Sequence, residues 1–142
     1  MPELGERDLP PFLWEIVERW KQRCVLGLLQ GFTPNEANAN YYERDKKNHL
    51  SAHFDDRSLS GEVLVNLSLR SSCVMTFENP KRGTCVRVPL AQRSLQVVSG
   101  KARYDYTHAI ANADLGGPVR ISLTFRKAQL TGPLGKRSGG RL

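Results

Sequence analysis

The sequence predicts one mainly β domain, an antiparallel sandwich or open barrel preceded by a single amphipathic helix. Its 142 residues are enough for one hydrophobic core and too few for a second independent one. After Gly31, short runs of apolar and β-branched residues alternate with turn sequences such as ENPKRG and VSGK. Short strands separated by such turns are typical of antiparallel folds.

The helix is expected over residues 11–26, with the Pro10-Pro11 pair marking its start. Its apolar side chains recur at helical spacing and form one stripe. They are Leu13, Ile16, Val17, Trp20 and Cys24. We expect this stripe, aromatic residues included, to pack against the sheet rather than to form a ligand site.

Strands are expected wherever apolar and polar residues alternate between turn signals. The runs that fit are 40–42, 50–56, 63–69, 73–77, 84–90, 94–100 and 119–125. Three domain segments follow: residues 1–31 as the helix and its lead-in, residues 32–126 as the barrel, and residues 127–142 as a tail.

Composition favours a globular protein inside the cell, with 39% hydrophobic and 25% charged residues. No apolar run approaches the roughly 18–20 residues that a membrane span needs, and the acidic, proline-bearing start does not resemble a secretory signal. We expect the cytoplasm, the nucleus or both, and a monomer. The three cysteines, which lack CxxC spacing, are expected to be reduced, buried thiols.

The net charge of +7 is concentrated at the C-terminus, because residues 127–142 hold four basic residues and no acidic one. This glycine-rich tail is expected to be disordered. Its basic residues fit either a solvated terminus or a weak, salt-sensitive contact with nucleic acid or another polyanion. We favour the solvated terminus.

The stretch LSAHFDD, residues 50–56, seats His53 and Asp55 two positions apart, where a strand points both side chains to one face. Two histidines and one carboxylate form the facial triad that holds non-haem Fe(II). The second histidine would be His49 or His108. We favour His108, because a barrel brings together residues from distant strands.

The run RISLTFR, residues 120–126, would line the interior with polar groups. Alternation puts Arg120, Ser122, Thr124 and Arg126 on one strand face. The two arginines lie about 20 Å apart along an extended strand, and their side chains can reach toward each other. Guanidinium groups bind carboxylates in a bidentate manner, so the gap would suit a short dicarboxylate such as 2-oxoglutarate.

Together these residues resemble the AlkB-like Fe(II)- and 2-oxoglutarate-dependent dioxygenases, from about Phe32 to Phe125. The matching pieces, in order, are N-x-Y at 40–42, H-x-D at 53–55, RSLQVVSGKARYDYTHAI at 93–110 and RISLTFR at 120–126. HFDDRSLSGEVLVNLSL and VPLAQRSLQVVSGKARYDYTHAI look most like the fourth animal AlkB homologue. The resemblance implies a double-stranded β-helix, or jelly roll.

The resemblance also implies an enzyme that uses Fe(II), 2-oxoglutarate and molecular oxygen. His53, Asp55 and His108 would bind the iron. Arg120 would pair with the distal carboxylate of 2-oxoglutarate, and Arg126 would lie near its keto-acid end. The full set of residues implied to contact 2-oxoglutarate is Asn40, Tyr42, Arg120, Ser122 and Arg126.

Such an enzyme would remove methyl groups from nitrogen by oxidation. Nucleic-acid demethylases of the family carry an N-terminal lid that grips a flipped base, and 39 residues precede Asn40. We therefore expect a methylated protein substrate, methyl-lysine on an actin-like protein by resemblance, with methylated nucleic acid as the alternative. A non-catalytic binding module that retains the barrel, and a structural zinc site, are the other hypotheses.

Overall fold

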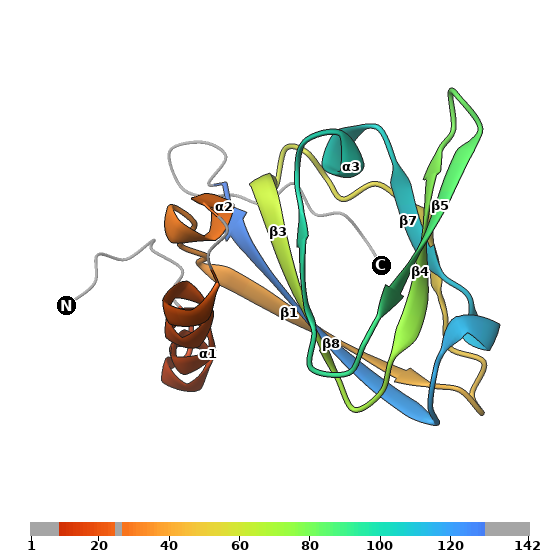
Figure 1. Ribbon diagram of the computed structural model, residues 1–142, viewed down its shortest axis with the longest axis horizontal. Helices are drawn as coiled ribbons and strands as arrows, with labels where there is room; N and C mark the ends of the chain where they lie inside the picture. The colour runs from red at the N-terminus through yellow and green to blue at the C-terminus, as the bar shows by residue number, and fades with distance from the viewer. Residues whose placement is uncertain (1–8, 25–26, 130–142) are drawn as a thin grey trace.

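The computed structural model describes residues 9–24 and 27–129. Within these ranges, eight strands form two antiparallel four-stranded sheets (Figure 1). The arrangement is the double-stranded β-helix implied by the sequence. Residues 1–8, residues 25–26 of the expected helix and residues 130–142 of the expected tail lie outside the described ranges.

The first sheet has the strand order β1, β8, β3, β6. Its strands are β1 (Glu36–Glu43), β8 (Val119–Ala128), β3 (Ser60–Leu69) and β6 (Leu95–Val98). The second sheet has the order β2, β7, β4, β5. Its strands are β2 (Leu50–His53), β7 (Thr107–Ile110), β4 (Cys73–Asn79) and β5 (Thr84–Leu90).

Helix α1 (Pro11–Arg23) covers the outer face of the first sheet, with the short α2 (Gly27–Gln30) beside it (Figure 1). Leu13, Val17 and Trp20 are buried on its inner side, and the Trp20 ring meets the Phe125 ring edge-on at 4.8 Å. The prediction that the helix stripe packs against the sheet is therefore confirmed.

The side chains of β8 alternate between the core under α1 and the space between the two sheets. Phe125 points outward into the core beneath α1 and is fully buried. Arg120 and Ser122 are buried on the opposite face, between the sheets. The expected polar interior is present, and a second apolar cluster that includes Met75, Phe77 and Ile110 packs around it.

Several expected boundaries were wrong. The strand expected over 50–56 ends at His53, and the one expected over 94–100 covers only Leu95–Val98. The chain turns at Gly100, whose φ of +55° favours glycine, into the short helix α3 (Gly100–Tyr104). At the other end β8 runs to Ala128, so the first two residues assigned to the tail belong to the sheet.

The three cysteines are free, but only Cys73 is buried. Cys85 is exposed, contrary to expectation, because it lies on edge strand β5. A 3₁₀ turn, η1 (Asn112–Asp114), follows β7. None of the helices in the described ranges combines the length and the apolar character that crossing a membrane requires.

Replacing Phe125 by alanine should lower the free energy of unfolding by about 3–5 kcal/mol, because it opens a cavity between α1 and the sheet. Phe12→Ala is the matched control: this side chain is 65% exposed, so its loss should change the free energy by less than about 0.5 kcal/mol. Urea denaturation measures both. Equal effects of the two substitutions would contradict the packing of α1 on β8.

Candidate metal centre

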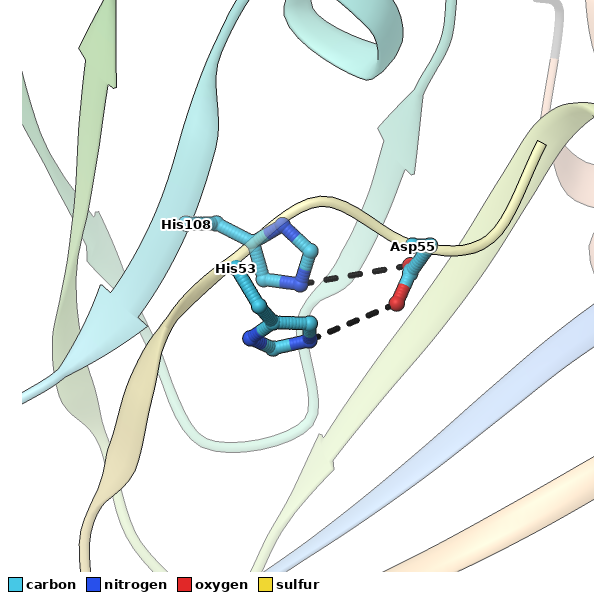
Figure 2. A group of neighbouring side chains, drawn as sticks. All are labelled: His53, Asp55 and His108. Carbon is cyan, nitrogen blue, oxygen red and sulfur yellow. Dashed lines mark ion pairs between the residues drawn. The ribbon is translucent and has the colours of Figure 1, made fainter. Parts of the chain in front are cut away.

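His53 and His108 meet because β2 and β7 are antiparallel neighbours whose register places the two residues directly opposite each other. Asp55 lies two residues beyond the end of β2, in the loop that follows. Figure 2 shows that this loop curves so that the Asp55 carboxylate faces both imidazole rings. The two side chains converge, as expected. The expected reason, that both lie on one face of a strand, was wrong, because the strand ends at His53.

The three side chains form a tight group. Asp55 Oδ1 lies 3.4 Å from His53 Nε2, and Asp55 Oδ2 lies 3.9 Å from His108 Nε2. One ligand atom from each residue falls within 4.8 Å of the others. The centroids of the two imidazole rings are 4.4 Å apart. This spacing allows one metal ion to contact all three groups.

Hydrogen bonding and packing orient the two rings. His53 Nδ1 lies 2.6 Å from the Ser51 carbonyl oxygen, which makes Nδ1 the protonated nitrogen and leaves Nε2 free to bind a metal. On the other side of β7, the Phe77 ring lies 6.1 Å from the His108 ring. The contact of His53 with Ser51 is typical of metal-binding histidines, which commonly donate a hydrogen bond from the nitrogen that does not bind the metal.

The electrostatics of the group favour a cation. The hydrogen bond with Asp55 raises the pKa of His53 above its ordinary value. Burial lowers the pKa of His108, which favours the neutral ring that a metal requires. Burial alone would raise the pKa of Asp55, but the hydrogen bond with His53 and the nearby positive groups lower it overall. The carboxylate is thus ionised at neutral pH.

The donor set matches non-haem iron better than structural zinc. Two imidazole nitrogens and one carboxylate form the facial arrangement typical of Fe(II) oxygenases, which leaves coordination positions open. Structural zinc sites are closed by four protein ligands. Among the described residues, the potential metal-binding group comprises only these three side chains.

The triad opens into a cavity between the two sheets. Of the five residues implied to contact 2-oxoglutarate, four line this cavity: Asn40, Tyr42, Ser122 and Arg126. Arg120 does not line it, but its guanidinium group lies 5.5 Å from the centre of the Tyr42 ring, which does. His49 lies outside the cavity and is exposed.

Two arginines lie at or near the cavity: Arg126 lines it, and Arg120 lies behind Tyr42. Arg120 is 1% exposed and donates one hydrogen bond, from Nη2 to Ser68 Oγ at 2.9 Å. Its Nε and Nη1 atoms, and Nε of Arg126, are buried without a hydrogen-bond partner among the described residues. Because unpaired buried guanidinium donors are costly, the two arginines fit a dicarboxylate bound between them.

A second, largely apolar groove continues from this cavity, and the two share Gln96 and Val98. The groove lies between β5, β6 and α3 and carries two aromatic side chains, Phe77 and Tyr106. The residues that line it are Phe77, Val86, Val88, Gln96, Val97, Val98, Ala102 and Tyr106. Most of this lining is aliphatic or aromatic, as is common in small-molecule binding sites.

Arg103 of α3 holds the loop that carries Asp55, a role that the sequence did not suggest. It is 2% exposed and donates to the carbonyl oxygens of Asp55 at 2.8 Å and Asp56 at 3.2 Å. It also donates to Ser60 Oγ at 3.0 Å. Arg57 of the same loop donates in return to the carbonyl oxygen of Tyr104. These contacts tie α3 to the loop.

Sequence comparison agrees with the Fe(II) oxygenase type of site that the three side chains suggest. The profile of the 2OG-Fe(II) oxygenase superfamily matches residues 3–126. The tRNA (carboxymethyluridine(34)-5-O)-methyltransferase ALKBH8 of Macaca fascicularis is 36% identical over 87% of this chain. A DNA N6-methyl adenine demethylase of Caenorhabditis elegans is 32% identical over 70% of the chain. Alpha-ketoglutarate-dependent dioxygenase alkB homolog 4 of Homo sapiens is 29% identical over 94%.

The chain spans 21%, 34% and 53% of the lengths of these three relatives, respectively. Among solved structures, OsALKBH1 matches 89% of this chain and 66% of its own with a TM-score of 0.56 and 19% identity. The structural match supports the jelly-roll fold.

Replacing Asp55 by asparagine should weaken Mn(II) binding, used as a stable substitute for Fe(II), by more than about 100-fold. Even the loss of a residue that only supports a metal ligand commonly costs 10- to 100-fold. Asp56→Asn is the control, since Asp56 is exposed and accepts hydrogen bonds from Ser58. It should retain wild-type affinity in titration calorimetry. Similar losses in both variants would argue against Asp55 as a ligand.

Proposed function

The chain belongs to the 2OG-Fe(II) oxygenase superfamily, and from this premise we propose that it removes methyl groups from nitrogen atoms by oxidation. It is a 2-oxoglutarate-dependent dioxygenase of the AlkB-like kind that uses Fe(II) and molecular oxygen. We assign the iron to His53, Asp55 and His108. The observation that carries this assignment is the convergence of the three ligand atoms within 4.8 Å at the edge of the cavity.

We assign 2-oxoglutarate to the cavity between the sheets. Arg120 and Arg126 would bind its carboxylates, and Asn40, Tyr42 and Ser122 would add polar contacts. Burial raises the pKa of Tyr42, so its hydroxyl remains protonated and able to donate. The two arginines supply the buried donors that lack partners within the described chain.

When bound, Fe(II) together with oxygen and 2-oxoglutarate supplies the oxidising power. One oxygen atom enters succinate as carbon dioxide leaves, and the other oxidises the methyl carbon, which departs as formaldehyde. The protein's own side chains hold the reactants in place. Arg103 fixes the loop of Asp55, and the apolar groove, which shares Gln96 and Val98 with the cavity, would hold the methylated part of the substrate.

A methylated nucleic acid is the first substrate class to test. The names of two relatives refer to tRNA and to methylated adenine in DNA. The flat face of a methylated base stacks on aromatic and apolar side chains, and the groove offers Phe77 and Tyr106 among aliphatic neighbours.

Methyl-lysine in a protein is the second candidate. Its side chain is a long apolar stem that ends in a methylated cation, and aromatic rings attract such cations. The groove contains the Phe77 and Tyr106 rings among aliphatic neighbours. This candidate agrees with the expectation from sequence, and the two substrates differ in the salt dependence of their binding.

The purified protein should convert 2-oxoglutarate to succinate when supplied with Fe(II), ascorbate and oxygen, and His53→Ala should abolish this conversion. His49→Ala is the matched control because His49 is an exposed histidine outside the triad. Succinate is measured by mass spectrometry. A folded protein that binds metal and yet forms no succinate would instead support the non-catalytic binding module.

Methylated substrates should raise succinate formation and release formaldehyde. The amount of formaldehyde should equal the increase in succinate over the reaction without substrate. We expect an oligonucleotide containing N-methyladenine to be demethylated faster than a methyl-lysine peptide, with unmethylated versions as controls. Faster demethylation of the peptide, at both low and high salt, would reverse the order of the two candidates.

Val86→Asp should raise the KM for the methylated substrate by about tenfold or more, because it places a charge in the apolar groove. Formation of succinate without that substrate should be unchanged. Cys85→Asp is the matched control, since Cys85 is the exposed neighbour outside the groove lining. The groove assignment fails if the two variants bind and process the methylated substrate equally well.

A further inference from the structure

Asn66 of β3 is a buried amide whose hydrogen bonding is incomplete. It is 8% exposed and lines the cavity. Its amide group faces two hydroxyl groups of β8, with Nδ2 2.5 Å from Ser122 Oγ and 2.8 Å from Thr124 Oγ1. Its Oδ1 atom has no hydrogen-bond partner among the described residues. In this orientation the amide nitrogen donates to both hydroxyls, and the buried oxygen has no donor.

Rotating the Asn66 amide by 180° would give its oxygen hydrogen-bond donors from the same two hydroxyl groups. Serine and threonine hydroxyls donate as well as accept, and the two ends of an asparagine amide have nearly the same shape. With Oδ1 turned toward β8, that oxygen accepts from both hydroxyls. The amide nitrogen, with its two N–H donors, then takes the buried position of Oδ1 in a side chain that lines the cavity. No buried acceptor is left unpaired on Asn66.

The location of Asn66 gives those donors an anionic partner. In the β3–β8 register Asn66 lies opposite Thr124, Ser68 opposite Ser122, and Leu64 opposite Arg126. Asn66 therefore stands between Arg120 and Arg126 along the length of β8. A dicarboxylate that reaches from one arginine toward the other must pass beside it.

We propose that Asn66 binds 2-oxoglutarate through its amide N–H groups, with Ser122 and Thr124 holding the amide in that orientation. The assignment rests on the proposed placement of 2-oxoglutarate in the cavity. It gives Ser122 a second part: besides lining the cavity, its hydroxyl holds the Asn66 amide in place. Charge-assisted hydrogen bonds of this kind are among the stronger ones in proteins.

Gln96 is the alternative partner for the Asn66 amide. It lies opposite Asn66 in the β3–β6 pair, and its Oε1 atom is also buried without a partner. An Asn66 amide that served only Gln96 would be structural. Because Ser122 lies opposite Ser68 rather than beside Gln96 in the sheet, an amide placed at position 122 would then not restore the 2-oxoglutarate affinity lost in Asn66→Ser. Moving the amide from β3 to β8 separates the two explanations.

The test is titration calorimetry of 2-oxoglutarate into the Mn(II)-loaded full chain, which measures binding without turnover. Asn66→Ser should weaken 2-oxoglutarate binding by about tenfold or more, as expected for loss of a hydrogen bond to a charged group. The exchanged variant Asn66→Ser/Ser122→Asn returns an amide to the same space from β8, and it should recover most of the affinity. Mn(II) affinity, measured in parallel, should be unchanged in both variants.

Wild-type 2-oxoglutarate affinity in Asn66→Ser would overturn the assignment of Asn66, as would an exchanged variant that binds no better than Asn66→Ser. An unaltered protein that binds Mn(II) but not 2-oxoglutarate would overturn the proposed placement of 2-oxoglutarate, and the assignment of Asn66 with it. Loss of Mn(II) binding in Asn66→Ser would show that the residue supports the fold of the metal centre, and would likewise count against a direct contact.

Discussion

The antiparallel pairing of β2 with β7 is the constraint on which the candidate site depends. It sets His53 directly opposite His108, and the ring centroids lie 4.4 Å apart. Since β2 ends at His53, the chain is free to curve and present Asp55 to both rings. The loop does not adopt this path alone, because buried Arg103 holds its carbonyl groups. Strand pairing thus places the two nitrogen ligands, and the contact with α3 places the carboxylate.

Strand β8 contributes to both the hydrophobic core and the cavity. Its outer face contributes Phe125 to the core under α1, and its inner face contributes Arg120, Ser122 and Arg126. The packing of α1 therefore fixes the strand that carries the arginines. Burial of guanidinium donors without partners is unfavourable, and Arg120 and Arg126 hold such donors, which supports the proposed placement of 2-oxoglutarate. A bound dicarboxylate would stabilise the folded chain, since a ligand that binds only the native state shifts the unfolding equilibrium.

Much of this could be predicted from sequence, because alternation and spacing are local signals. Period-two alternation in residues 120–126 correctly separated Phe125 from the arginines. Barrel topology favoured His108 over His49 as the partner of His53, and the structure places His108 beside it. The end of β2 at His53 was not predictable, because residues 54 and 55 continue an apolar and polar alternation. The hydrogen bonds of buried Arg103 and Asn66 were also missed. Each depends on contacts between residues more than 40 positions apart, and arginine and asparagine in short sequence runs usually indicate solvent-exposed positions.

The most direct test of the central claim, that these three side chains hold one metal ion next to a 2-oxoglutarate site, is a crystal structure of the chain grown with Mn(II) and 2-oxoglutarate under anaerobic conditions. Anomalous diffraction locates the manganese without reference to any assumed site. The account predicts one strong anomalous peak in contact with His53, Asp55 and His108, and density for 2-oxoglutarate that extends from the metal between Arg126 and Arg120. A peak elsewhere, or a metal bound by fewer than these three side chains, would contradict it.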